Sequence, residues 1–362
     1  MIDERLEALF GIARRVRDSS DALGVEVRAG LRAMSSLSTE GIELALTEHL
    51  EVDATEAQRA SLRAWCRAGR TAGSPPATTC HVVLSAHVCT AALRAIAIAL
   101  ESAANVVVKP SRRDPVLAEV LVRELARAGI SICVATDIDP ARHDEVHAYG
   151  ADATLDAIHG SLPEGVRFRG HGSGFGLACV GPNDSIDDAA SALARDVVPF
   201  DQRGCLSPRV VLVPDVARAT AFADALDRSL GAAAFSVPRG ALAPDERAEL
   251  AVFTRTCEAL GEVLAGPEHT IALAEDLDRI FLPPTTRAVL VAVVEPSKAH
   301  CVVGPLTRYL TTIGGNAEAI DAYAAAMDPA DRLASARRAP LGSMQRPPLD
   351  GPVDRRQSTM TE

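Results

Sequence analysis

The sequence predicts an α/β protein with parallel sheets and two domains. Short apolar segments alternate with segments that repeat apolar residues every three or four positions, which is the pattern of strands and helices in βαβ units. The alternation begins at Cys80 and starts again after Phe200. A chain of 362 residues, 48% of them hydrophobic, is long enough to form two cores.

The first part of the chain, to about residue 70, is expected to be helical. Apolar residues recur at helical spacing in "RLEALFGIARRV" and in "EAQRASLRAWCRAG". The stretch from Thr71 to Thr79 is rich in Pro, Gly, Ser and Thr and ends this pattern.

The first alternating series predicts a Rossmann-type parallel sheet. Strands are expected in "CHVVLSA", "NVVVKPS" and "ISICVATD", with helices in "TAALRAIAIALESA" and "DPVLAEVLVRELARAG". A weak strand in "EVHAYGADATLDAIHGSL" leads into a turn at Tyr149 to Asp152 and then a helix, and "FGLACVG" begins a further segment. In such sheets, ligands lie beyond the carboxyl ends of the strands.

The second series predicts a second α/β domain. It contains the strand in "CLSPRVVLV", the helices "VARATAFADALDRSL" and "ERAELAVFTRTCEALGEVL", and the strand "AVLVAVVE". The polar tail from Arg337 is rich in Pro and Arg, so we expect it to be extended, docked or partly disordered. The expected divisions are 1–199 for the helical part and cofactor domain, 200–328 for the catalytic domain and 329–362 for the tail.

Composition excludes several classes of function. A net charge of −11 without clustered Lys and Arg argues against a nucleic-acid partner or an anionic membrane surface. No apolar run approaches the roughly 20 residues of a membrane span, and no signal peptide is visible, so we expect a cytoplasmic protein. The eight cysteines form no CxxC pair and have no His partner at ligand spacing, so no metal site is expected.

Cys205 is the strongest candidate for chemistry. In "FDQRGCLSPRVVLV" it lies in a polar turn directly before an apolar strand, whereas the other seven cysteines are expected to be small core residues. A thiol at such a turn projects toward the space between two α/β domains, where backbone N–H groups can stabilise a thiolate and later an oxyanion. Gly204 leaves room for a substrate carbonyl.

The segment "NVVVKPSRRDP" is the second candidate. Lys109 is one of only two lysines among 37 basic residues, and with Ser111 it ends a strand where a dinucleotide's adenosine ribose would lie. Arg112 and Arg113 offer planar groups suited to a phosphate. The alternative is a solvated basic turn that opens the next helix.

These segments, together with "LGSMQRPPLDG" in the tail, resemble the LuxC-type acyl-CoA reductases. Those long-chain fatty acyl-CoA reductases supply aldehyde for bacterial luminescence and form a branch of the aldehyde dehydrogenase superfamily. The resemblance extends from about Val82 to about Arg355 and implies an aldehyde-dehydrogenase-like fold. It implies that Cys205 is the acyl-accepting nucleophile.

The resemblance also implies a nicotinamide cofactor. Lys109 and Ser111 would hold its adenosine ribose, and Arg112 stands where NAD-preferring relatives carry a Glu, so NADP is expected. Gly150 and Ala151 in "AYGAD" resemble the superfamily's turn that faces the pyrophosphate at a helix N-terminus, although Asp152 beside them can also be read as a simple N-cap.

Two histidines complete the expected site. "RGHGSGFG" resembles the family segment that places a histidine near the cysteine, so His171 would deprotonate the thiol or transfer a proton to the departing CoA. His87 in "SAHVCT" stands where the superfamily has an oxyanion-binding Asn. An imidazole N–H can replace that donor, but losing it typically costs about 100- to 1,000-fold in rate.

Further departures concern the tail and the nicotinamide ribose. Ser343 and Gly351 stand where the family pattern has Arg and Trp, and the Glu-x-Phe-Gly-Pro motif is absent, with Glu295 as the candidate substitute. The predicted reaction is reduction of a fatty acyl-CoA, or of an acyl-protein thioester, to the aldehyde by NADPH through an acyl-enzyme. Two alternative functions remain: an acyl-phosphate reductase and a nucleotide-binding subunit without activity. The possible partners are a second copy of the chain in a homo-oligomer and an acyl-transfer protein.

Overall fold

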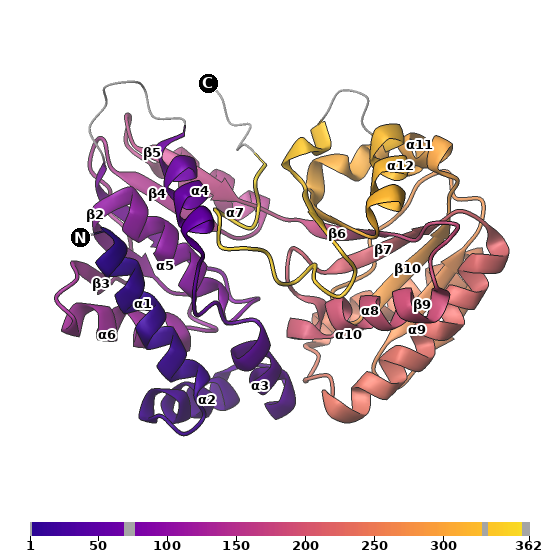
Figure 1. Cartoon of the computed structure of the whole chain (residues 1–362), viewed down its shortest axis with the longest axis horizontal. Helices are drawn as coiled ribbons and strands as arrows, with labels where there is room; N and C mark the ends of the chain where they lie inside the picture. Colours follow the sequence, from indigo (N-terminus) through magenta and orange to yellow (C-terminus); the bar gives the residue numbers. More distant parts are fainter. Residues whose placement is uncertain (1, 69–76, 328–331, 357–362) are drawn as a thin grey trace.

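The computed structural model describes residues 2–68, 77–327 and 332–356. The chain forms two lobes, each built around a parallel sheet, and the C-terminal segment passes between them (Figure 1). Most of the stretch expected to end the helical pattern, from Thr71 to Pro76, lies outside the described residues.

The N-terminal segment is helical, as expected. Apolar residues at helical spacing, among them Leu6, Leu9 and Phe10, turn one face of the first helix into the core of the first lobe. These helices pack against the helices that cover the first sheet. They are α1 (Ile2–Arg17), α2 (Ala22–Met34), α3 (Thr39–Glu48) and α4 (Glu56–Arg67).

The first sheet is parallel and has the strand order β3-β2-β1-β4-β5. Its strands are β1 (Ala77–Val83), β2 (Ala103–Lys109), β3 (Ile132–Val134), β4 (Glu145–Tyr149) and β5 (Arg167–His171). The connecting helices are α5 (Ala91–Ser102), α6 (Val116–Arg127) and α7 (Asp152–Ser161).

The register of the first sheet brings the expected cofactor residues to one edge. Val83 at the end of β1 pairs with Lys109 at the end of β2, and Tyr149 at the end of β4 pairs with His171 at the end of β5. The loops that follow these strands therefore meet at the same edge of the sheet.

The second sheet has the strand order β12-β11-β6-β7-β10-β9-β8 and is parallel except for β8. Its strands are β6 (Phe175–Cys179), β7 (Pro208–Val213), β8 (Glu262–Ala265), β9 (Thr270–Ala274), β10 (Ala288–Val293), β11 (Leu310–Gly314) and β12 (Arg337–Ala339). The helices around it are α8 (Ile186–Val197), α9 (Val216–Ser236), α10 (Pro244–Leu260), α11 (Ala299–Val303) and α12 (Ala317–Met327).

The chain enters the second lobe earlier than the expected division at residue 200. β6 pairs with β7 and β11, so it belongs to the second sheet together with the helix α8 that follows it. All five residues of β6 are buried, because neighbouring strands flank it on both sides. The crossing between the sheets therefore lies at residues 172–174.

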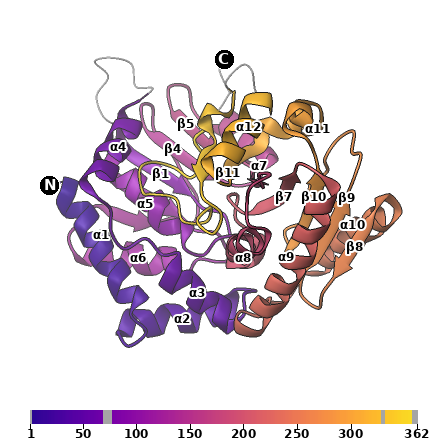
Figure 2. The same cartoon turned by 45° about the vertical axis from the view of Figure 1, so that its right-hand side comes forward.

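The tail is docked and crosses back over the boundary between the lobes (Figures 1 and 2). After β12 it returns to the first lobe, where Arg94 of α5 donates hydrogen bonds of 2.7, 2.9 and 2.8 Å to the carbonyl oxygens of Pro347, Pro348 and Gly351. Gly351 lies against the ring of Trp65 on α4. We call residues 340–356 the strap.

Candidate active site

Cys205 occupies the turn between the short 3-10 helix η1 (Pro199–Gln202) and β7, as the sequence predicted. The residue is half-buried. The N–H of Ser207 closes the turn with a 3.0 Å hydrogen bond to the carbonyl of Gly204. The carbonyl of Cys205 accepts a hydrogen bond from Oγ1 of Thr311 on β11. The backbone of the nucleophile candidate is thus held from two sides.

Three residues before this turn adopt an unusual backbone conformation. Phe200, Asp201 and Gln202 have φ values of 54, 51 and 67°, in the left-handed region that costs a non-glycine residue about 1–3 kcal/mol each when the backbone is strained. Buried hydrogen bonds offset this cost. The Gln202 amide donates to the carbonyls of Pro208 and Ala288 at 2.8 and 2.7 Å and accepts from the Ala288 N–H at 2.8 Å. It ties the segment before Cys205 to the starts of β7 and β10.

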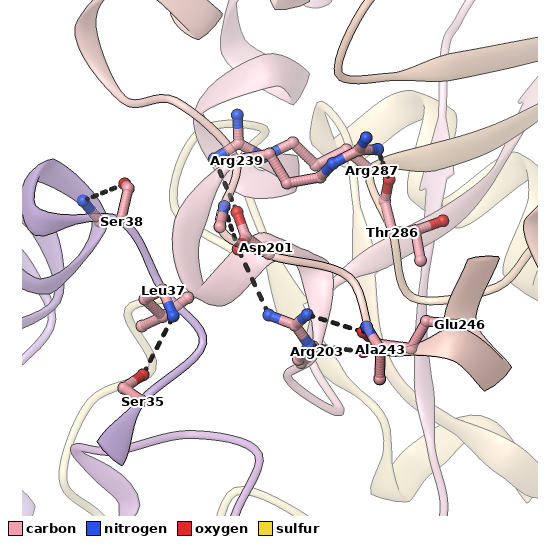
Figure 3. A network of polar contacts seen from close by, with 12 residues as sticks. Ser35, Leu37, Ser38, Asp201, Arg203, Arg239, Ala243, Glu246, Thr286 and Arg287 are labelled. Carbon is pink, nitrogen blue, oxygen red and sulfur yellow. Dashed lines mark hydrogen bonds and ion pairs between the residues drawn. The ribbon is translucent and has the colours of Figure 1, made fainter. Parts of the chain in front are cut away.

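Asp201 anchors the same segment through a buried polar network (Figure 3). Its carboxylate accepts hydrogen bonds from Arg287 at 2.7 Å, from the Gly240 N–H at 3.0 Å and from Arg203 at 3.3 Å. Arg203 also pairs with Glu246 at 2.9 Å. The Asp and Gln of the cysteine motif therefore shape the turn. Neither residue had a role that its sequence context predicted, and no local signal pointed to Arg287.

Two distant segments converge on Gly204. A methyl group placed on its Cα would lie 3.2 Å from Oε1 of Gln345 in the strap and 3.6 Å from Cγ2 of Val88 in the loop after β1. Gln345 also donates to Ser207 and, at 3.1 Å, to the carbonyl of Asp196. The room expected beside Gly204 is therefore bounded by the strap and by the first lobe.

The Cys205 thiol is protonated at neutral pH in this structure. Burial, followed by the negative charge of Asp354, raises its pKa to about 11. Arg356, the residue's own backbone N–H and Arg337 act in the opposite direction. The backbone N–H favours the thiolate, as the sequence predicted, but the loss of water outweighs it.

His171 ends β5 and is buried. Its ring stacks on Tyr149 with centroids 4.5 Å apart, and within the described chain its Nε2 has no hydrogen-bond partner. Burial lowers its pKa to about 3, with His147 contributing, so the ring is neutral at neutral pH. A base with this pKa accepts protons weakly. His171 and Cys205 share Asp354 and Arg356 as charged neighbours.

His87 lies in the loop after β1, as expected of an oxyanion donor in this fold. The charged groups that face it are Arg113, Arg203 and Glu246. Its neighbour Val88 is the residue that approaches Gly204. The loop therefore contacts the cysteine turn, whereas a hydrogen bond from His87 to a substrate oxygen stays a prediction.

The expected ribose residues lie at the edge of the first sheet. Nζ of Lys109 is 2.9 Å from Oδ1 of Asp137, which follows β3. Oγ of Ser111 accepts a hydrogen bond of 3.3 Å from the Arg113 N–H, and Arg112 is exposed. The ammonium is present where the sequence predicted it, but a carboxylate already neutralises it.

The turn expected to face a pyrophosphate precedes helix α7. The Gly150 N–H donates to the carbonyl of His171 at 3.2 Å, and no heavy atom lies within 4 Å of the position that a Cβ on Gly150 would occupy. Ala151 is the N-cap residue. Asp152 does not cap the helix; its carboxylate accepts a 2.8 Å hydrogen bond from the Ser173 N–H at the crossing between the sheets.

The geometry of this edge fits a dinucleotide. The helix N-terminus at Ala151 and the open space beside Gly150 suit a pyrophosphate, and Lys109 with Ser111 suits a ribose. In the described ranges, no three His, Cys, Asp or Glu side chains gather as a metal site would require. None of the helices in these ranges is both long and apolar enough to cross a bilayer.

Solved structures with the same fold are aldehyde dehydrogenases and related enzymes. Proline utilization A from Bradyrhizobium japonicum is 15% identical with a TM-score of 0.67, over 97% of this chain and 39% of that one. An acetylating aldehyde dehydrogenase from Geobacillus thermoglucosidasius is 14% identical with a TM-score of 0.63, over 95% and 83%. An aldehyde dehydrogenase from Mycobacterium tuberculosis, complexed with NAD+, is 13% identical with a TM-score of 0.67, over 94% and 77%.

These likenesses show that the chain has the aldehyde dehydrogenase fold. It spans 38 to 39% of the length of the proline utilization A chains that it matches. A comparison with curated proteins found no match. The family described as acyl-CoA reductase (LuxC) matches residues 26–346. The match extends over most of the sequence, and the chain therefore belongs to the LuxC acyl-CoA reductase family.

Proposed function

We propose that this protein reduces a long-chain fatty acyl-CoA to the aldehyde, with Cys205 as the nucleophile and NADPH as the hydride donor. One observation carries the proposal: in a chain that belongs to the LuxC acyl-CoA reductase family, Cys205 lies in the turn before β7. Its half-buried thiol lies in a turn that contacts the loop after β1 and the strap. The adjoining edge of the first sheet supplies groups that suit a dinucleotide.

The reaction proceeds in two stages at one sulfur atom. The Cys205 thiolate attacks the thioester carbonyl, the C–S bond to CoA breaks, and the CoA thiolate leaves as an acyl-cysteine forms. A nicotinamide cofactor held at the edge of the first sheet would supply the hydride that converts the acyl-cysteine to a thiohemiacetal. Collapse of the thiohemiacetal releases the aldehyde and regenerates the thiol. The N–H of Cys205 and the ring of His87 would stabilise the oxyanion of each tetrahedral species.

His171 does not act as a strong base in this mechanism. With a pKa near 3, His171 is neutral and accepts a proton only weakly. Its Nε2, which has no hydrogen-bond partner in the described chain, is better suited to a hydrogen bond with the sulfur of the departing CoA. No water needs to attack the acyl-cysteine, so a Glu base is not required for reduction.

NADPH is proposed because of the charge at Arg112. Lys109 and Ser111 would hold the adenosine ribose, Gly150 and Ala151 the pyrophosphate, and the guanidinium of Arg112 a 2′-phosphate. Asp137 opposes this preference for NADPH. Its carboxylate lies 2.9 Å from Nζ of Lys109, where it would repel a 2′-phosphate.

The test is detection of the acyl-enzyme by intact mass spectrometry. With a long-chain acyl-CoA, the wild-type protein should gain the mass of one acyl group, and Cys205→Ala should gain none. Cys301→Ala should behave as the wild type does; like Cys133, Cys301 is exposed and not in the core, contrary to the expectation for these cysteines. Labelling that survives in Cys205→Ala would refute the proposal. Labelling by an acyl phosphate but not by an acyl-CoA would favour the acyl-phosphate reductase, and labelling by neither would indicate a subunit without activity.

A further inference from the structure

The charged side chains that influence the thiol of Cys205 lie near the C-terminus, on β12 and in the strap. In the described residues they are Asp354, Arg356 and Arg337. Arg337 on β12 is occupied by the strap itself: it donates to the carbonyls of Pro352 and Val353 and pairs with Asp350 at 2.8 Å. The remaining pair, Asp354 and Arg356, belongs to the strap and lies close enough for its charges to act on the thiol.

Arg356 is held where the two lobes meet. It donates hydrogen bonds of 2.9 Å to the carbonyl of Ser173, in the crossing between the sheets, and of 2.8 Å to that of Arg308. Two further hydrogen bonds, of 2.7 and 2.6 Å, join it to Asp354. The side chains of Arg356 and Asp354 are 18% and 7% exposed, so water screens their charges poorly.

Thr311 connects this pair to the cysteine turn. Its hydroxyl donates to the carbonyl of Cys205, and its methyl group lies against Gly174. A Cβ placed on Gly174 would also lie 3.4 Å from Nη2 of Arg356. Cys205 and Arg356 therefore lie around the same residue of β11. His171 faces the pair from the first lobe.

We infer that the strap sets the charge state of the nucleophile, with Arg356 stabilising the Cys205 thiolate and Asp354 opposing it. Loss of the thiol proton to solvent creates a negative charge in a poorly hydrated seam. A guanidinium there stabilises that charge and a carboxylate destabilises it. Arg356 is thus a positioning residue that acts through the sulfur. The inference deepens the proposed function, because the thiolate is the attacking species, but its test requires no substrate.

The test is the rate at which iodoacetamide alkylates Cys205, followed by peptide mass spectrometry from pH 7 to 10. Arg356→Gln should slow alkylation at pH 8 by about 3- to 10-fold, the change that half to one pKa unit produces. Asp354→Asn should accelerate it by a similar factor. Arg355→Gln, which alters an adjacent exposed arginine that pairs with Asp350, should leave the rate unchanged.

Opposite changes in the alkylation rate, slower in Arg356→Gln and faster in Asp354→Asn, distinguish an electrostatic role of the strap from a structural one. If the strap only covers the site, both substitutions loosen it and both accelerate alkylation, which would overturn the inference. An unchanged rate in Arg356→Gln would overturn it as well. If Arg356→Gln does not fold, Arg356→Lys keeps the cation and should stay within about threefold of the wild type, while Asp354→Asn still tests the sign. Failure of acyl-CoA reduction would leave these alkylation results unaffected.

Discussion

Asp201 and Arg287 form a buried ion pair at the base of the cysteine turn. Nη2 of Arg287 lies 2.7 Å from Oδ1 of Asp201, and each side chain is 2% exposed. Both residues have positive φ values, 51° and 59°. The pair therefore connects two strained backbone segments, the one that leads into Cys205 and the one that leads into β10, and it fixes where the thiol lies.

Breaking this pair should destabilise the protein strongly. Asp201→Asn leaves the Arg287 guanidinium buried beside a neutral amide, and removing one partner of a buried pair typically costs about 3–5 kcal/mol. We expect the free energy of unfolding in urea to fall by that amount. Asp187→Asn is the control, because Asp187 and its partner Arg228 are 82% and 66% exposed and such pairs contribute less than about 1 kcal/mol. Equal losses in the two variants would contradict this account.

Reversing the charge at Arg112 should change cofactor preference. Arg112→Glu removes a cation and adds an anion where the 2′-phosphate is proposed to bind. We expect KM for NADPH to rise at least about tenfold, and KM for NADH to change little. Steady-state kinetics with both cofactors measures this. Arg127→Glu at the far end of α6 makes the same change in net charge and should affect neither. Equal effects of Arg112→Glu on both cofactors would refute the 2′-phosphate assignment.

Removing the hydrogen bonds by which Arg94 holds the strap should lower the rate of aldehyde formation. Arg94 donates to three strap carbonyls, so Arg94→Met leaves these without their donor. We expect limited proteolysis to cut the C-terminal segment faster and aldehyde formation to fall at least about tenfold, as poorly positioned groups lose rate. Arg346→Met is the control within the strap itself, because Arg346 is exposed and pairs with Glu48. Wild-type proteolysis and activity in Arg94→Met would contradict this role.

His171 should make the protein sensitive to acid. Its pKa is about 3 in the folded state and about 6.5 in the unfolded chain, so between these values the unfolded state binds more protons. Its contribution to stability is complete above pH 6.5 and is lost as the pH falls toward 3, by up to about 1.4 kcal/mol per pH unit. His171→Phe should reduce this slope in urea unfolding between pH 6.5 and 4.5, whereas His300→Phe, at an exposed position, should not. The same slope in all three proteins would contradict the burial of His171.

Local patterns in the sequence predicted much of the fold. The strands β1, β2, β3, β4, β7 and β10 and the helices α5, α6, α7, α9 and α10 lie where the sequence pattern placed them. The expected helix that continued to residue 264 ends at Leu260, and β8 follows it. Its four residues pair antiparallel to β9, and such an edge strand is defined by its partner rather than by its own composition.

The division between the lobes was misplaced for a related reason. The sequence pattern marks "FGLACVG" as the start of a further segment, but it does not say which sheet the segment joins. β6 lies between β7 and β11, which follow it by about 30 and 130 residues, so its place is decided by parallel partners far along the chain.

The sequence by itself determined which residues have the chemistry: a thiol in a turn before a strand, an ammonium at the end of another strand, and a guanidinium where an NAD enzyme would have a carboxylate. These are local properties, because side-chain type and backbone pattern are read within a few residues. Only the tertiary structure decided what surrounds Cys205. Asp354 and Arg356, about 150 residues away in the sequence, act on its thiol because the strap folds back between two parallel sheets and charges act through space, not along the chain.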